Sequence, residues 1–209
     1  MATLLYLEAS PRKQRSHSIA VANSFLEAYR SAHPGDSIRT IDLWDDPLPS
    51  FDGNTIDAKY AVMHRAEPTP GQQAAWAEIT RIADDFKAAD KYLFSLPMWN
   101  FGIPYVLKHF IDVIVQPGLT FNVTPQGQYQ GLVTGRPAVL VCARGGAYGP
   151  GSNAEAMDNQ TTYMKTILKF IGFENIETVL VEPTVAGRDR LDQIRQQATD
   201  RARRLAESL

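Results

Sequence analysis

Short apolar runs alternate with longer segments of helical periodicity along the whole chain. Apolar runs of about six residues predict strands at 3–8, 37–43, 91–96, 138–142 and 176–181. Apolar residues spaced at i, i+3 and i+4 predict amphipathic helices at 18 to about 33, 72–89, 105–115, 159–171 and 189–207. This alternation predicts an α/β fold, with a five-stranded, doubly wound parallel sheet and helices on both faces.

The first, third and fourth apolar runs are nearly continuous, which is typical of central strands covered on both faces. Two stretches are long for connections, 44–70 and 116–136. Prolines and a glycine break regular structure in the first, so we expect it to be functional or interface-forming. Thr120–Val123 and Tyr129–Val133 in the second predict a hairpin. We expect a single domain over residues 1–209 with these two insertions.

Composition narrows the functional classes. With 209 residues, 44% hydrophobic and 21% charged, the chain has the ordinary make-up of a globular domain. A net charge of −2 argues against a nucleic-acid binder, which usually carries a basic face. The single cysteine, Cys142, lies in an apolar run, which favours a buried structural thiol over a reactive one and excludes a disulfide framework or a cysteine-based zinc site. We expect no bound metal.

The same pattern bears on location. No stretch of about 18 consecutive apolar residues predicts a membrane span. The segment before Glu8 lacks the basic region and the long apolar region of a secretory signal. We therefore expect a cytoplasmic protein that does not act at a membrane.

Ligands of open α/β sheets bind beyond the carboxyl ends of the strands, which directs attention to three loops. The loop after the first strand combines hydroxyls and basic side chains with a helix N-terminus between Ser10 and Ser18. Unsatisfied N–H groups and the helix dipole favour an anion there, and phosphate is the natural guest. The alternative is that Ser16 or Ser18 only caps the helix. Neither a Walker motif nor a G-x-G-x-x-G fingerprint is present.

The other two loops follow the third and fourth strands. Residues 97–104 place two aromatics, an amide and a glycine together, which could lay a flat ring against apolar side chains; the alternative is that Trp99 and Phe101 belong to the core or an interface. Residues 143–151 are rich in glycine, so the backbone can approach a ligand closely. The alternative here is a flexible surface loop without a ligand.

Three motifs together resemble one family. They are S-P-R followed by S-x-S, the string P-M-W-N-F-G-I-P, and A-R-G-G after the fourth strand. The chain resembles the flavodoxin-like, FMN-dependent NADH:azoreductases, which also act as quinone reductases, and the likeness covers nearly the whole chain. Trp99 stands where a tyrosine is common, and Ala143 where a serine is common.

The resemblance implies a set of site residues. The FMN phosphate would be held by Ser10, Ser16, His17 and Ser18. The ribityl chain and one edge of the isoalloxazine would be held by Met98, Trp99, Asn100 and Phe101. The pyrimidine end would be held by Ala143, Arg144, Gly145 and Gly146. Phe121 would help wall the substrate pocket, across a dimer interface.

The implied activity is two-electron transfer from NADH or NADPH to quinones and azo compounds by a ping-pong mechanism. The flavin N5 carries the chemistry, so no side chain is expected to be an obligatory catalyst, and His109 is expected to be structural. One alternative is a flavodoxin-type electron carrier, which the nearly neutral charge and the two insertions disfavour. A dimeric interaction module without cofactor, and a chromate or nitro reductase, are further alternatives. The sequence leaves open the physiological acceptor and the choice between NADH and NADPH, and the homodimer rests on the resemblance and the insertions.

Overall fold

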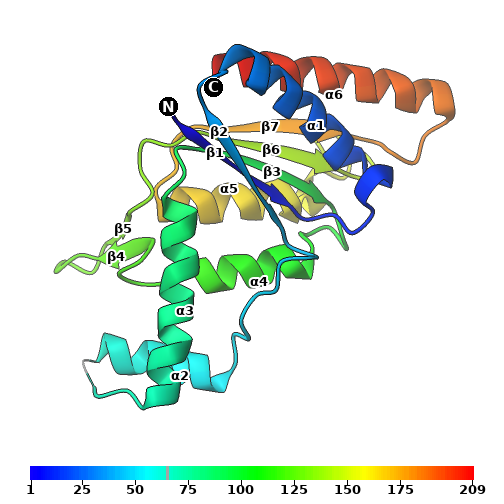
Figure 1. Cartoon of the computed structure of the whole chain (residues 1–209). Helices are drawn as coiled ribbons and strands as arrows, with labels where there is room; N and C mark the ends of the chain where they lie inside the picture. The colour runs from blue at the N-terminus through cyan, green and yellow to red at the C-terminus, as the bar shows by residue number, and fades with distance from the viewer. Residues whose placement is uncertain (65) are drawn as a thin grey trace.

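The computed structural model describes residues 1–64 and 66–209 and has a five-stranded parallel sheet at its centre (Figure 1). The strand order is β2-β1-β3-β6-β7. The strands are β1 (Thr3–Glu8), β2 (Ser37–Asp42), β3 (Lys91–Pro97), β6 (Ala138–Ala143) and β7 (Ile176–Val181). The three nearly continuous apolar runs are the three central strands, β1, β3 and β6, as predicted.

Helices cover both faces of the sheet. One face packs against α1 (His17–Ala32) and α6 (Arg188–Ser208), and the other against α3 (Pro70–Lys87), α4 (Tyr105–Ile114) and α5 (Asn159–Ile171). Alternate residues of a strand point to opposite faces, so Leu4 joins the α1–α6 core while Leu5 joins the other. Each strand and helix predicted from periodicity is present, and Gly172 ends α5 with a φ of 117°.

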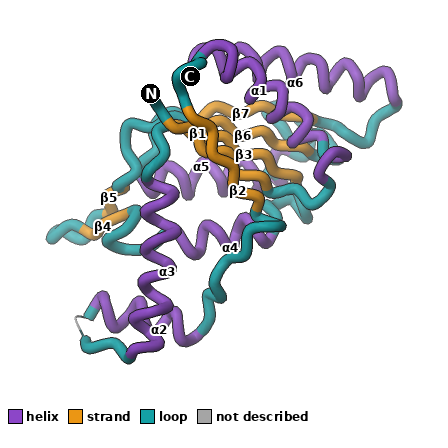
Figure 2. Tube along the Cα trace, viewed as in Figure 1, coloured by secondary structure: helices purple, strands orange, loops and turns teal. Residues whose placement is uncertain are grey.

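The first insertion differs from the prediction. Residues 44–70 contain a regular helix, α2 (Gly53–Met63), which begins where the Asp52 side chain accepts a hydrogen bond from Thr55 N at 3.1 Å. Only Thr55 and Ala58 are buried along it, so the helix has no continuous apolar face and its periodicity is weak. Figure 2 shows α2 crossing the end of α3 that lies farthest from the sheet.

The second insertion forms the predicted hairpin. Strands β4 (Phe121–Val123) and β5 (Tyr129–Gly131) pair antiparallel. Two short 3₁₀ helices complete the fold, η1 (Lys13–Arg15) and η2 (Glu155–Met157). Among the described residues, no helix is long and apolar enough to cross a membrane.

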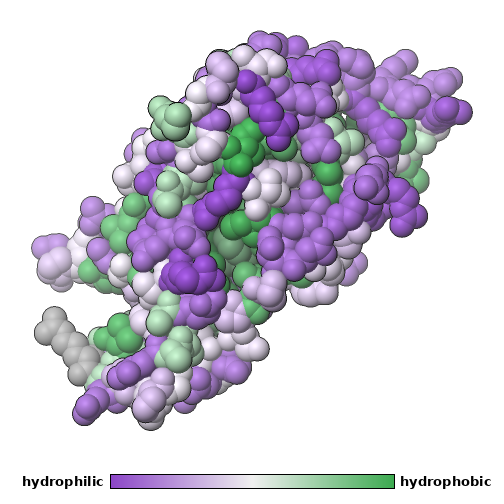
Figure 3. Space-filling model, viewed as in Figure 1, coloured by the Kyte–Doolittle hydropathy of each residue, from purple (hydrophilic) through white to green (hydrophobic). Residues whose placement is uncertain are grey.

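A hollow on the face seen in Figure 3 exposes apolar side chains between the loop after β2 and α3. It holds about 440 Å³ and is lined by Ile41, Leu48, Ile82 and Phe110 among other residues. Charged side chains, including Arg39 and Asp85, also line it. Its lining includes none of the residues predicted for the site.

Both ends of the described chain lie at the edge of the sheet where the parallel strands begin (Figure 1). Ala2 N donates to Asp36 Oδ1 at 2.6 Å, next to the start of β2. At the other end, the Ala206 carbonyl lies 3.1 Å from His33 Nε2. The two termini are therefore attached to the same short segment after α1.

Asp36 contacts several groups at this edge of the sheet. Besides Ala2 N, it accepts a hydrogen bond from the Tyr29 hydroxyl at 2.7 Å and pairs with Lys91 Nζ at 3.4 Å. The Ala2 N–H, followed by the Tyr29 hydroxyl, lowers the pKa of Asp36 from 3.8 to about 2. A depressed carboxyl pKa contributes stability that is complete above the unfolded-state pKa and lost as the pH falls through the folded-state pKa.

Asp36→Asn is therefore expected to lower the urea midpoint of unfolding at pH 5 and above. The difference in urea midpoint between the variant and the unmodified protein should shrink as the pH falls from about 4 to about 2, because residue 36 is then neutral in both proteins. Urea unfolding followed by circular dichroism at stepped pH measures the gap. The matched control is Asp57→Asn, on the exposed side of α2. A gap that does not change with pH would contradict the assignment.

Candidate functional site

Three loops meet at the carboxyl edge of the sheet, because β1, β3 and β6 are neighbours. Ala9 N donates to Ser95 O at 2.9 Å, which joins the end of β1 to β3. Met98 N donates to Ala143 O at 2.8 Å, which joins the loop after β3 to the end of β6. The loops predicted to hold one ligand thus form one continuous edge.

The first loop ends at the N-terminus of α1. Ser16 is the N-cap, its Oγ accepting from Ile19 N at 3.4 Å and lying 3.1 Å from Ser18 Oγ. Ser10 is 1% exposed, and its Oγ has no hydrogen-bond partner among the described residues. A buried hydroxyl without a hydrogen-bond partner destabilises the fold unless a bound ligand forms the missing hydrogen bond. The capping role of Ser16 is therefore real, but it does not account for Ser10.

A distant arginine reaches the same helix terminus. Arg195 of α6 donates to His17 Nδ1 from Nε at 3.0 Å, and its NH2 lies 2.8 Å from the same atom. His17 Nδ1 is therefore an acceptor, and the ring proton resides on Nε2. Burial, then the charges of Arg195 and Arg12, lower the pKa of His17. The terminus thus carries a positive charge that sequence reasoning missed.

Lys13 does not serve as an anion ligand. Its ammonium pairs with Glu8 at 3.2 Å, with Asp45 at 3.4 Å and closely with Asp42. Burial is the main cause that raises the pKa of Glu8. Lys13 therefore fixes the loop to β1 and to the end of β2, whereas Arg12 and Arg15 are exposed.

The second loop is a tight turn with unusual backbone geometry. Trp99 N donates to Gly102 O at 3.1 Å and Gly102 N donates to Trp99 O at 2.9 Å. Asn100 and Phe101 have φ values of 46° and 68°. Positive φ at both central residues defines a type I′ turn, in which glycine is the usual second residue. Phe101 is strained here, and the residue is 43% exposed.

The Phe101 turn allows a direct test. Phe101→Gly is expected to raise stability by about 1 kcal/mol relative to Phe101→Ala, because only glycine adopts positive φ without strain. Both variants remove the ring, so comparing their urea midpoints isolates the backbone term. Equal midpoints would show that the turn carries no strain.

Aromatic side chains gather beside this turn. The Trp44 ring lies 5.8 Å from that of Trp99 and 5.4 Å from that of Tyr105. Trp99 and Tyr105 are 6.2 Å apart. Trp99 is thus packed in an aromatic cluster, whose member Trp44 comes from the first insertion. An apolar surface cavity of about 450 Å³ adjoins the turn at Gly102 and Ile103 and continues along α4 and α5.

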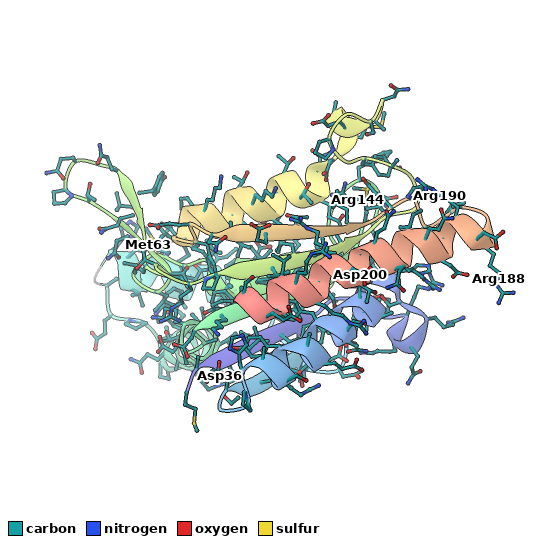
Figure 4. The ribbon with its side chains drawn as sticks, turned by 90° about the horizontal axis from the view of Figure 1, so that it is seen from above. Asp36, Met63, Arg144, Arg188, Arg190 and Asp200 are labelled. Carbon is teal, nitrogen blue, oxygen red and sulfur yellow. The ribbon has the colours of Figure 1, made fainter. Side chains whose placement is uncertain are left out.

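The third loop changes the role expected for Arg144. Arg144 was predicted among the residues at the pyrimidine end of a flavin, and its side chain is completely buried. Figure 4 shows Arg144 where β6 and β7 end, beside the start of α5. Its backbone is also committed, because Arg144 N donates to Val181 O and Arg144 O accepts from Thr184 N. Ala143 is buried too, so Gly145 and Gly146 are the residues of this motif nearest the surface.

Two other predicted residues lie apart from the three loops. Phe121 packs against Phe170 at 4.7 Å, near the C-terminal end of α5 and the edge where the strands begin (Figure 1). Within one chain it is not brought to the carboxyl edge. His109 was predicted to be structural, and its Nε2 lies 2.9 Å from Pro49 O.

The residues that remain form a coherent cradle. A cationic helix terminus with an unpartnered buried hydroxyl fits a phosphate. In the other two loops, the Asn100–Phe101 turn and Gly145 are exposed and Gly146 is half-buried, so they are accessible to a ligand at this edge. Cys142 is fully buried, and burial raises its pKa to about 12, so this thiol is not a nucleophile. No group of acidic, histidine or cysteine side chains suited to a metal occurs among the described residues.

Comparison with known proteins gives one consistent result. The Flavodoxin_2 family, described by its flavodoxin-like fold, matches residues 2–206. FMN-dependent NADH:quinone oxidoreductases from Desulfotalea psychrophila and Nitratidesulfovibrio vulgaris are 53% and 51% identical, over 91% and 99% of both chains. The crystal structure of an azoreductase from Bacillus anthracis superposes with a TM-score of 0.92 at 29% identity, covering 100% of both chains. An FMN-dependent NADH-azoreductase from Bacillus anthracis in complex with FMN gives 0.87 at 30% identity, covering 99% of this chain and 100% of that one.

Proposed function

Because the chain belongs to the family of FMN-dependent NADH:quinone oxidoreductases with the flavodoxin-like fold, we propose that it uses FMN to carry two electrons from NADH or NADPH to quinones and azo compounds. The observation that carries the proposal is the buried Ser10 hydroxyl, which has no hydrogen-bond partner among the described residues, in the loop that leads to the Ser16–Ser18 helix terminus. We assign the phosphate of FMN to this helix terminus. The neighbouring strand β3 ends in the loop that carries the exposed Asn100–Phe101 turn.

Different residues of the site would bind different parts of FMN. The side chains of Ser10, Ser16 and Ser18, with the first N–H groups of α1 and His17 Nε2–H, would bind the phosphate. The predicted set from Met98 to Phe101 would line the ribityl chain and one edge of the ring. Ala143, Gly145 and Gly146 would approach the pyrimidine end through their backbone, and Arg144 would support them from beneath. The chemistry that bound FMN supplies is the uptake of a hydride from the nucleotide and the delivery of its two electrons to the acceptor.

The protein contributes position and a suitable electrostatic field. Arg195 holds His17 as a neutral donor and adds positive charge at the phosphate end. Phe101, half exposed on its turn, offers an apolar surface against which a flat donor or acceptor can stack. One open surface shared by donor and acceptor implies that they bind in turn, hence ping-pong kinetics.

Two finer features are part of the proposal. Phe121 can wall the substrate pocket only if a second copy brings its hairpin to the carboxyl edge, so the role assigned to Phe121 requires a homodimer. The single buried thiol suits a reducing compartment such as the cytoplasm. The domain is proposed to span residues 1–209, with both insertions as parts of it.

The deciding experiment is an anaerobic visible spectrum of the protein with FMN, before and after NADH and then after benzoquinone. Bleaching by NADH and recovery with the quinone would establish both half-reactions. A flavin that binds but is reduced only by NADPH would fix the donor. A flavin reduced by neither nucleotide would favour the flavodoxin-type carrier, and no flavin binding would refute the proposal.

A further inference from the structure

Glu182, the residue after β7, binds the backbone of another loop with both carboxylate oxygens. Oε2 accepts from Tyr148 N at 2.8 Å and Oε1 accepts from Gly149 N at 2.7 Å. The side chain is only 13% exposed. A carboxylate with two N–H donors is a strong, orienting contact. It fixes the glycine loop after β6 to the end of β7.

Arg144 holds Glu182 in place from beneath. Its NH1 donates to Glu182 Oε2 at 3.2 Å, and its NH2 donates to Asp158 Oδ2 at 2.8 Å. Nε donates to Gln160 Oε1 at 2.9 Å, and Gln160 in turn donates to Leu96 O at 3.3 Å. The network therefore links the ends of β3, β6 and β7 with the start of α5. A buried charge is tolerated only with such partners.

The glycine loop is shaped to admit this carboxylate. A Cβ at position 149 would lie 2.3 Å from Glu182 Oε1, which is closer than any real contact. Val185 N donates to Gly145 O at 3.1 Å and adds a second link between the two loops. Gly149 is thus required by Glu182 rather than by an unusual backbone angle.

The contact between Glu182 and the Tyr148 backbone also affects the position of the Tyr148 ring. Its ring meets the Phe101 ring edge-on, with centroids 5.9 Å apart and planes at 74°. Tyr148 also packs beside Gly146, where a Cβ would lie 3.1 Å from its ring. Because Glu182 fixes the Tyr148 backbone N–H, it fixes where this ring stands against the strained turn.

We propose that Glu182, held by Arg144, is a positioning residue that sets Tyr148 against Phe101 as one wall of the surface where the electron acceptor binds. This inference rests on the proposed function, since it assumes FMN between the turn and the glycine loop. Arg144 thereby acts through Glu182 rather than by contact with the flavin.

The test compares Glu182→Gln with Glu177→Gln, a control on β7, the strand that Glu182 follows; the Glu177 carboxylate pairs with Arg201 at 2.9 Å. Glutamine offers one acceptor oxygen where two N–H groups need partners, so one of them is left unpaired. Amide hydrogen exchange at Tyr148 and Gly149 should become faster in the Glu182 variant alone. The freed loop must then be ordered again when FMN binds, so the FMN dissociation constant should rise by up to about tenfold, an upper limit set by the lost charge-assisted bond. The KM for benzoquinone should rise about fivefold while kcat stays within about twofold.

Gly149→Ala keeps all charges but displaces the Glu182 carboxylate, and it should reproduce the rise in KM. It serves as the second variant if Glu182→Gln does not fold, with circular dichroism reporting folding. Failure of the unmodified protein to bind FMN would refute the proposed function itself. Normal FMN binding with unchanged FMN affinity and KM in both variants would overturn the positioning role alone. Faster amide exchange with unchanged KM would also overturn it, since the contact would then only stabilise the loop.

Discussion

Replacing Ser16 and Ser18 together with alanine is expected to weaken FMN binding by at least about tenfold, because each lost charge-assisted hydrogen bond is worth about 1.5–3 kcal/mol. The two hydroxyls lie 3.1 Å apart at the start of α1, after the loop that holds Ser10, whose buried hydroxyl has no partner in the part of the chain that the structure describes. Quenching of FMN fluorescence on titration with apoprotein measures the affinity. The matched control is Ser24→Ala, a half-buried serine of the same helix whose hydroxyl donates only to Ala20 O among the described residues.

Ser16 also caps α1, so the double variant should lose about 1 kcal/mol of folding stability. Riboflavin separates the two effects, since it has the ring system of FMN but no phosphate. Riboflavin affinity should be nearly unchanged in the double variant. If riboflavin and FMN weaken equally, the serines support the fold of the site rather than the phosphate, and the placement of FMN is wrong.

Gly131→Ala is expected to lower the free energy of unfolding by about 3 kcal/mol or more, since overpacking against atoms that cannot move is costly. A Cβ at position 131 would lie 2.3 Å from Gly172 N and 2.4 Å from Ile171 C. These are backbone atoms at the end of α5, so the hairpin must separate from the helix. Urea unfolding followed by circular dichroism measures the loss.

The control for this variant is Gly71→Ala in the first turn of α3, where an added Cβ meets no atom within 4 Å. Its stability should be unchanged or slightly higher, because alanine favours helix more than glycine does. A Gly131→Ala protein as stable as the control would mean that the hairpin is not seated on α5 as described.

The sheet and most helices could be predicted because each buries a regular apolar face. The central strands β1, β3 and β6 are covered on both sides, so their runs are unbroken. Helix α2 was missed for the opposite reason: Ile56, Tyr60 and Val62 are exposed on it, and no buried stripe marks its period. Its N-cap, Asp52, was the one local signal available.

That the three candidate loops lie at one edge could be predicted because parallel strands bring their carboxyl ends together. The tasks of individual charged residues could not be predicted, since their partners are distant in sequence. Lys13 forms an ion pair with Asp42, and Arg144 forms one with Glu182. His17 accepts a hydrogen bond from Arg195, which is 178 residues later in the chain. Local sequence shows that such side chains are present, but only the fold decides which carboxylate each one meets.

The shared position of the two chain ends has a practical consequence. Ala2 and Ala206 both contact the segment at His33–Asp36, at the edge where the strands begin, whereas the loops that we propose to hold FMN lie at the opposite edge. An affinity tag, a fluorescent fusion partner or an electrode linker joined to either terminus would therefore project away from the cofactor. If FMN binds where we propose, the protein could be tethered to a conducting surface by either end of the described chain with the flavin turned to the solution.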